Sequence, residues 1–179
     1  NRPMAHWHVD VDRAHPDTFQ SLTESVYLES NIFFEQLTEK VKSRDSSFLG
    51  SWYNLNEQRK ERHELFVSGL PYCDLKVFEL LAYYFKPDTN IHWSNSSSIR
   101  YAQLFSYAKG TRHFCNRGTS GIDGSTSTAV GHAISSGKDT YLVTGDISFL
   151  YDSNAFFNKH IPENLKIILI NNSGGGIFR

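Results

Sequence analysis

Cysteine, methionine and proline are scarce in this chain of 179 residues, which contains two, one and five of them respectively. Two cysteines are too few for a disulfide framework, and neither Cys73 nor Cys115 lies in a CxxC or another metal-ligand spacing. We therefore expect both thiols to be reduced. No apolar run approaches the roughly 20 residues that span a bilayer, and residues 1–10 lack the pattern of a signal peptide. These features predict a cytoplasmic protein without a membrane span.

An excess of positive charge is missing as well, since the formal net charge is -1 at pH 7. Without a broad basic surface, we expect no nucleic acid partner. The 39% of hydrophobic residues is enough to bury a core, and the length suits one domain plus part of another. The chain starts at Asn1 and stops at Arg179, just after a glycine loop, so we expect a piece truncated at both ends.

In the first half of the chain, apolar residues recur at two different spacings, one typical of a strand and one typical of helices. Residues 5–11 alternate apolar and polar side chains, which predicts a half-buried strand. Apolar side chains at helical spacing predict three helices, over residues 24–41, 48–63 and 75–85. The polar stretch at residues 42–47 indicates a linker and a domain boundary.

After Pro87 the pattern becomes one of short apolar runs, each followed by a polar turn and a helix-like stretch. This rhythm predicts an α/β fold built from successive βα units. The stretches between the runs are long enough for crossovers, so the strands should be parallel. The predicted strands cover residues 90–93, 111–115, 140–144 and 165–170.

Polar, charged or glycine residues follow all four predicted strands. In a parallel α/β sheet, ligands bind in the crevice beyond the carboxyl ends of the strands, so these positions are the candidates for chemistry. They are Asn95 and Ser96, Asn116 and Arg117, Gly145 and Asp146, and Asn171 and Asn172.

The residues that follow the last two predicted strands indicate a divalent cation site. Neighbouring strands lie about 4.8 Å apart, so Asp146 and Asn172 can approach one ion at the same edge of the sheet. A carboxylate, an amide oxygen and a loop carbonyl freed by glycines are the hard oxygen ligands that Mg²⁺ prefers, and a diphosphate would complete its shell. The glycines at 174–176 allow the backbone to approach that anion closely, beside helix N-termini. A Gly-Asp turn or a glycine-rich loop taken alone is compatible with a purely structural role.

Together these elements resemble the binding motif of thiamine-diphosphate enzymes. Three segments are similar to one family of that superfamily, the synthases of menaquinone biosynthesis: NRGTSGIDG at 116–124, GDISFLYDSN at 145–154 and NSGGGIF at 172–178. The motif-bearing match covers roughly residues 90–179. The resemblance implies that residues 1–42 are the C-terminal end of an α/β central domain with its linker. Residues 43–179 would be the parallel-sheet domain that binds the diphosphate and the metal, incomplete at its C-terminus.

The resemblance also implies roles for single residues. Asp146, Asn172 and the carbonyl of Gly174 would hold the metal, and Ile122 would be an apolar wedge under the cofactor. The implied cofactor-binding residues are Ser120, Ile122, Gly145, Asp146, Ile147, Ser148, Asn172, Gly174, Gly175, Ile177 and Phe178. The implied catalytic residues, around the substrates, are Asn95, Ser96, Arg100, Arg117 and Ile122, with Ile177 and Phe178 as an apolar wall.

The implied reaction uses thiamine diphosphate with Mg²⁺ or Mn²⁺ to decarboxylate 2-oxoglutarate and to add the resulting carbanion to isochorismate. Both substrates are dicarboxylates, which suits bidentate recognition by Arg100 and Arg117. The glutamate that activates the cofactor belongs, in this family, to an N-terminal domain that these residues do not include, and the sites form between subunits of a homodimer or homotetramer. We therefore expect the fragment alone to be inactive.

Other interpretations remain open at this point. An acetolactate synthase relative would share the metal motif, although the Asn-Arg-Gly segment at 116–118 argues against it. A Rossmann-type nucleotide binder would need GxGxxG after its first strand, and the only glycine cluster follows the last one. A non-catalytic interface module is the third alternative. The His6, His8 and Asp10 pattern could bind a transition metal, but exposed positions of an edge strand explain it better.

Overall fold

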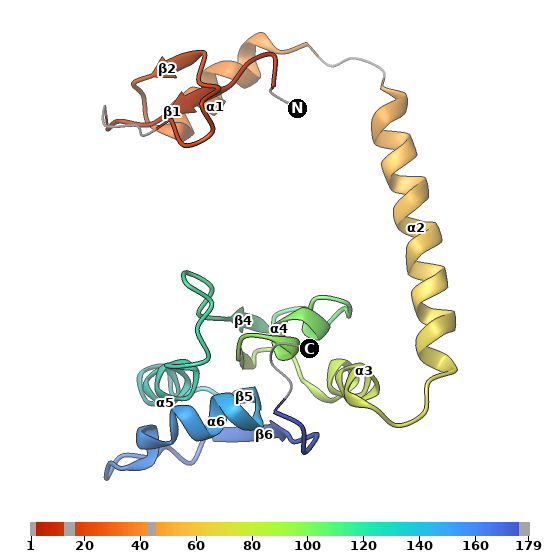
Figure 1. Ribbon diagram of the computed structural model, residues 1–179, viewed down its shortest axis with the longest axis vertical. Helices are drawn as coiled ribbons and strands as arrows, with labels where there is room; N and C mark the ends of the chain where they lie inside the picture. Colours follow the sequence, from red (N-terminus) through yellow and green to blue (C-terminus); the bar gives the residue numbers. More distant parts are fainter. Residues whose placement is uncertain (1–2, 13–16, 43–45, 176–179) are drawn as a thin grey trace. The chain divides into compact units, whose positions relative to one another are not determined.

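The computed structural model describes residues 3–12, 17–42 and 46–175 of the chain (Figure 1). The chain divides into two compact units, Asn1–Asn56 and Glu57–Arg179, and the boundary between them falls within one helix. Each unit is described by itself.

The first unit contains two short strands and a helix. Strands β1 (Trp7–Val9) and β2 (Glu24–Val26) pair in parallel, with Trp7 opposite Glu24, and helix α1 covers Ser30–Lys40. The predicted strand over residues 5–11 is therefore confirmed in its central part. The predicted helix over residues 24–41 was wrong in its first part, because pairing with β1 extends the backbone there before the helix begins.

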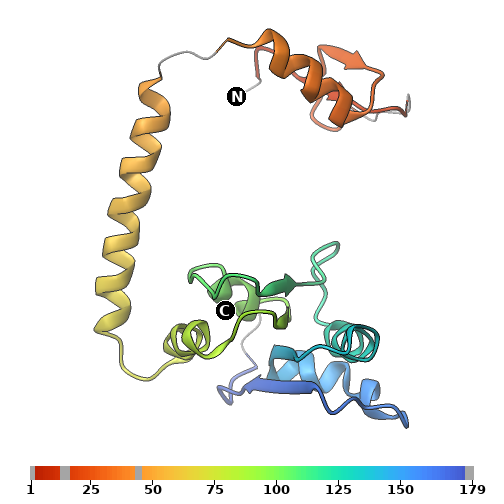
Figure 2. The same cartoon turned by 180° about the vertical axis from the view of Figure 1, so that it is seen from behind.

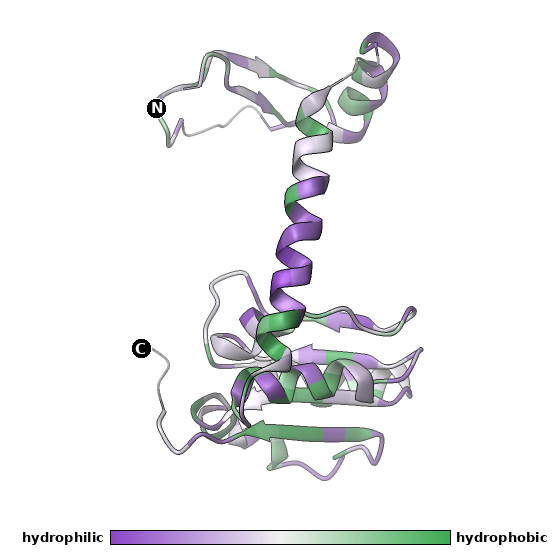
Figure 3. Ribbon diagram, turned by 90° about the vertical axis from the view of Figure 1, so that its right-hand side faces the viewer, coloured by the Kyte–Doolittle hydropathy of each residue, from purple (hydrophilic) through white to green (hydrophobic). Residues whose placement is uncertain are grey.

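Helix α2 covers Ser47–Ser68 and is longer than the predicted 48–63. Its middle is strongly hydrophilic, as Figure 3 shows, whereas the apolar side chains of Leu65, Phe66 and Val67 continue the helix past the predicted end. The helix stops before Gly69 and Pro71, residues that favour a turn. Sequence spacing thus located this helix but underestimated its length.

The second unit contains a four-stranded parallel sheet with strand order β4-β3-β5-β6 (Figures 1 and 2). The strands are β3 (Asn90–Trp93), β4 (Arg112–Phe114), β5 (Thr140–Gly145) and β6 (Leu165–Ile170). The helices are α3 (Asp74–Tyr84), α4 (Ser97–Ala102), α5 (Ser125–Ser136) and α6 (Asp146–Tyr151), with a 3-10 turn η1 (Ser153–Phe156). The predicted α/β fold with parallel strands is confirmed.

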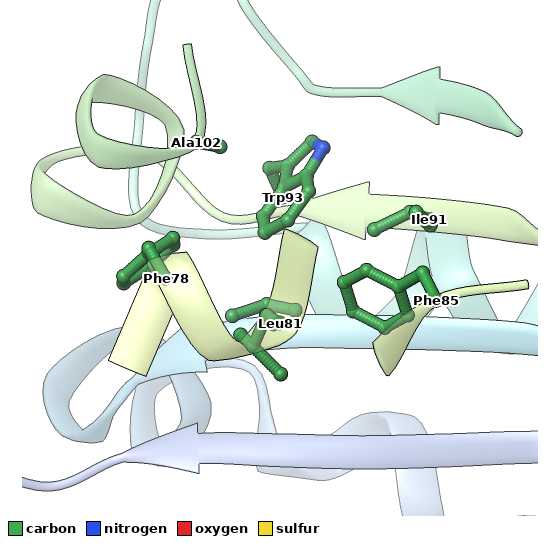
Figure 4. Close-up of a cluster of buried hydrophobic side chains, with 7 residues drawn as sticks. Phe78, Leu81, Phe85, Ile91, Trp93 and Ala102 are labelled. Atoms are coloured by element: carbon green, nitrogen blue, oxygen red, sulfur yellow. The ribbon is translucent and has the colours of Figure 1, made fainter. Parts of the chain in front are cut away.

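Helices cover both faces of the sheet, and the side chains of β3 point alternately toward one face and the other. Ile91 and Trp93 pack with α3 in a cluster of buried apolar side chains, as Figure 4 shows. The neighbouring side chains point the other way, since Asn90 and His92 hydrogen-bond to residues of α5. Because α3 packs on the sheet through Phe78, which is 1% exposed, its first turn is held beside the carboxyl ends of the strands.

His92 lies on the α5 face, with its Nε2 atom 2.7 Å from Nδ1 of His132 and its ring stacked on Phe114. Burial, with a smaller contribution from His132, lowers the pKa of His92 to about 4 from its ordinary value of 6.5. The neutral ring therefore stabilises the fold fully above pH 6.5. This stabilisation is lost as the pH falls from 6.5 toward 4, because the unfolded chain then binds a proton that the folded chain does not.

We expect the free energy of unfolding of the full-length protein to fall between pH 7 and pH 5, and to fall less in the His92→Gln variant. Urea unfolding at both pH values measures this difference. Identical pH dependence in the wild type and the variant would show that His92 does not contribute to it.

Candidate functional site

A cavity lies at the carboxyl ends of β3, β5 and β6, where the sequence predicts ligand binding. The side chains and backbone that line it come from α3, from the β3–α4 connection, from the segment before α5, and from the β5–α6 and β6 ends. Its lining residues are Asp74, Phe78, Asn95, Ser96, Ser97, Ser98, Tyr101, Ile122, Gly145, Asp146, Ile147, Ser148, Ile170 and Asn172.

The strand register brings the two predicted metal-ligating side chains to this cavity. Gly145, the last residue of β5, pairs with Ile170, the last residue of β6, so Asp146 and Asn172 follow at the same edge of the sheet. The Oδ1 atom of Asp146 accepts a hydrogen bond from the Ile147 backbone N–H at 2.8 Å. A carboxylate and an amide side chain therefore line one cavity, as parallel neighbouring strands require.

The glycines after β6 have little room for side chains. A Cβ atom added at Gly175 would lie 3.1 Å from Cδ1 of Ile147, and the backbone there has φ +50°, a conformation that favours glycine. A Cβ at Gly174 would lie 3.3 Å from Oδ1 of Asn172. The Gly174 backbone N–H donates to that same oxygen at 3.1 Å, which folds the loop back on the Asn172 side chain.

Ile122 lines the cavity beside the start of α6. Its backbone carbonyl accepts a hydrogen bond from the hydroxyl of Ser148 at 2.7 Å, and Ser148 is 4% exposed. This buried contact joins the segment before α5 to the helix that begins with Asp146. The position of the Ile122 side chain is therefore coupled to the β5–α6 connection.

The buried side chain of Asn95 fixes the segment between β4 and Ile122. Its Nδ2 atom donates to the carbonyls of Asn116 at 2.8 Å and of Gly121 at 2.6 Å. Its Oδ1 atom accepts a hydrogen bond from Nη1 of Arg117 at 3.0 Å and one from the Cys115 thiol at 3.5 Å. With an exposure of 3%, Asn95 directs all of its polar atoms at protein groups around this segment.

Several serines at this edge have an unusual backbone conformation. Ser96, Ser120 and Ser173 have φ values of 71°, 59° and 58° and lie after β3, β4 and β6. A positive φ is uncommon outside glycine, and such strain collects where a fold must hold a particular local geometry. The turns that carry the candidate site are thus more constrained than ordinary loops.

Some of the predicted site residues do not line the cavity. Arg100 lies on α4 with an exposed side chain, and Arg117 is exposed apart from its contact with Asn95. Ser120 is exposed, and its hydroxyl donates to the Arg117 carbonyl at 3.3 Å. Two further predicted residues, Ile177 and Phe178, lie outside the described part of the chain.

Sequence reasoning missed part of the lining, above all Asp74. Its Oδ2 atom accepts a hydrogen bond from Nδ2 of Asn172 at 3.0 Å, across a sequence separation of 98 residues. Only its place as an acid directly before the predicted helix over residues 75–85 marks this position in the sequence, and acids near helix N-termini are common. Phe78, Ser97, Ser98, Tyr101 and Ile170 also line the cavity without a local motif.

Within residues 3–12, 17–42 and 46–175, no group of three or more histidine, cysteine, aspartate or glutamate side chains could hold a metal ion. The His6, His8 and Asp10 pattern therefore does not form such a site, and Nδ1 of His6 lies 3.0 Å from the Ser21 hydroxyl. In the same described part, no helix is long and apolar enough to cross a membrane.

Comparison with known proteins identifies relatives named 2-succinyl-5-enolpyruvyl-6-hydroxy-3-cyclohexene-1-carboxylate synthase. The chain is 51% identical over 178 residues to the one from Flavobacterium psychrophilum and 49% identical over 178 residues to the one from Flavobacterium johnsoniae. It is 35% identical over 187 residues to the one from Porphyromonas gingivalis. The chain is homologous to a part of these synthases. The predicted resemblance to the family is confirmed.

Each of these alignments covers 99% of the chain but only 32% of the synthase, so the chain spans about one third of the length of the curated relatives it matches. The similarity to the synthases includes the first unit as well as the half that contains the motifs. No protein-family model matches the chain.

Proposed function

We propose that this chain is the part of a thiamine-diphosphate-dependent synthase that holds the cofactor's diphosphate and its Mg²⁺. The observation that supports this most is the shared cavity of Asp146 and Asn172 at the carboxyl ends of β5 and β6. The homology to the synthases along the whole chain supports the same assignment.

The donor set fits the metal and the diphosphate. One carboxylate, one amide oxygen and the carbonyl of Gly174 are hard oxygen ligands, which suit Mg²⁺ or Mn²⁺ bound together with phosphate oxygens. The narrow space around Gly174 and Gly175 fits a loop whose backbone, without side chains, closes on an anion. In this proposal Asp146, Asn172 and Gly174 bind the metal, while Gly145, Ile147, Ser148 and Gly175 lie beside the diphosphate.

When bound, thiamine diphosphate supplies the nucleophilic carbon needed to decarboxylate 2-oxoglutarate and to join the remaining carbons to isochorismate. The product is 2-succinyl-5-enolpyruvyl-6-hydroxy-3-cyclohexene-1-carboxylate. The protein's contribution is to bind and orient the reactants. In this proposal Ile122 would support the cofactor from the cavity wall, and Ser120 would be placed beside its pyrimidine.

The substrates are dicarboxylates, so their recognition needs guanidinium groups. We assign Arg117 and Arg100 to this role, since a planar guanidinium forms two parallel hydrogen bonds with a carboxylate. Both arginine side chains are exposed in this chain, which leaves them accessible to a substrate. Ser96 lines the cavity. We also assign Ile177 and Phe178, which lie outside the described residues, to an apolar wall of the substrate pocket.

The remainder of the proposal concerns the whole protein. Residues 1–42 end a central domain, and residues 43–179 belong to the diphosphate-binding domain. The cofactor-activating glutamate comes from a further domain, in a homodimer or homotetramer that builds each site between subunits. A cytoplasmic location fits Cys73 and Cys115, which are both free thiols.

An assay of the full-length protein and of the 179-residue chain tests this function. Both are incubated with 2-oxoglutarate, isochorismate, thiamine diphosphate and Mg²⁺, and product formation is followed by mass spectrometry. We expect product from the full-length protein only. Product from the 179-residue chain would contradict the assignment of the activating glutamate to another domain, and no product from either would contradict the function.

A further inference from the structure

Asp74 contacts the candidate metal site from a distant part of the sequence. It lies in the first turn of α3, lines the same cavity as Asp146, and accepts a hydrogen bond from Nδ2 of Asn172 at 3.0 Å. Helix α3 is anchored on the sheet by Phe78, whose ring is tilted by 30° to that of Trp93 in the core, with 5.9 Å between the ring centroids. The Asp74 carboxylate is therefore attached to a helix packed on the sheet, beside the turn that carries Asn172 and Gly174.

The amide group of Asn172 has its two ends fixed by different partners. On one side Nδ2 donates to Asp74, and on the other Oδ1 accepts from the Gly174 N–H at 3.1 Å. Turning the amide over would place its oxygen against the Asp74 carboxylate and its N–H₂ against the N–H of Gly174. Both contacts would then be repulsive, so only one orientation is compatible with them.

This orientation leaves one acceptor position of Oδ1 open. An amide oxygen accepts two hydrogen bonds or ligands, and the Gly174 N–H occupies one of them. The second can bind a cation in the cavity that Asn172 shares with Asp146. Metal ligands are commonly oriented in this way by a hydrogen bond that they donate to a residue that does not itself bind the metal.

We propose that Asp74 is a positioning residue for the metal: its carboxylate holds the Asn172 amide so that the amide oxygen faces the cation. This inference rests on the proposed function, because it requires a divalent cation at Asp146 and Asn172. It adds a third acid or amide side chain to the site, contributed by α3 rather than by the strands.

The test is the affinity of the full-length protein for Mn²⁺, used as a paramagnetic probe in place of Mg²⁺ at a fixed concentration of thiamine diphosphate. Free Mn²⁺ is measured by electron paramagnetic resonance. We expect Asp74→Ala to weaken Mn²⁺ binding by roughly tenfold, as for other residues that orient metal ligands. Asp74→Asn keeps a hydrogen-bond acceptor and should retain most of the affinity.

Glu79→Gln is the matched control. It removes a carboxylate from the same helix, one that pairs with Lys76 and does not line the cavity, so Mn²⁺ affinity should stay unchanged. If Asp74→Ala does not fold, Asp74→Glu replaces it, because the longer side chain keeps the charge but moves the carboxylate. That variant should also lose about tenfold in affinity.

Comparison with an Asn172→Ala background separates positioning from direct binding. If Asp74 acts through Asn172, Asp74→Ala adds no further loss there. An equal loss in both backgrounds, or an unchanged affinity in the Asp74→Ala and Asp74→Glu variants, would overturn the inference. If the wild-type protein itself does not bind Mn²⁺ with thiamine diphosphate, the proposed function fails, and this inference with it.

Discussion

Asp146→Ala in the full-length protein should weaken the binding of thiamine diphosphate with Mg²⁺ by a factor on the order of 100 or more, which is about 2.7 kcal/mol. The variant removes the only carboxylate among the three proposed ligands. The cation would then lose its only charged protein ligand in a partly enclosed cavity, where such an interaction is stronger than in water. Titration calorimetry with both ligands measures the loss.

Asp139→Asn is a suitable control for this experiment. Asp139 lies just before β5, at the opposite end of the strand from Asp146, and forms an exposed ion pair with Lys166 at 2.8 Å. The pair is remote from the proposed metal site, and exposed ion pairs contribute little to stability. Cofactor affinity should therefore be the same as in the wild type. If Asp146→Ala binds the cofactor as tightly as Asp139→Asn does, the metal site is not where we propose it.

Asn95→Ala should have the second large effect. The change removes the amide that connects the carbonyls of Asn116 and Gly121 and also leaves Arg117 without its partner. Unsatisfied polar groups in a partly buried setting make the protein less stable, here by about 2 kcal/mol. The loosened segment carries Arg117 and precedes Ile122, so synthase turnover at saturating cofactor should fall as well. Urea unfolding and the product assay measure the two effects.

The chain offers a matched control in Asn164. Its Nδ2 atom also bridges two carbonyls, those of Ala133 at 3.0 Å and Lys138 at 2.6 Å, but it lies before β6 at the other end of the sheet. Asn164→Ala should therefore lower stability to a similar extent and leave turnover unchanged in conditions where the protein is folded. Equal losses of turnover in the two variants would mean that Asn95 affects activity only through stability.

Much of the fold could be predicted, because the sequence patterns that define most of its strands lie within a few consecutive residues. Strands β3 and β6 were predicted to the residue, and β5 to within one residue, since short apolar runs bounded by polar turns define a buried parallel strand. The prediction failed at β2, where a strand of three residues has no period of its own and forms by pairing with β1. The length of α2 was also underestimated. Its middle is hydrophilic, so the helical spacing of apolar residues is interrupted before the apolar turn that ends the helix.

By itself, the sequence determined which residues stand at the ends of the strands and which family they resemble. Asp146 and Asn172 could be placed together in advance, because the carboxyl ends of neighbouring parallel strands always share an edge. Only the tertiary structure decided which side chains hold Asn172 and the other segments around the cavity in place. The contact of Asp74 with Asn172, and the contacts of Asn95 with Asn116 and Gly121, depend on how a helix or a turn packs on the sheet. Such packing joins positions far apart in the chain through hydrogen bonds that leave no local pattern in the sequence.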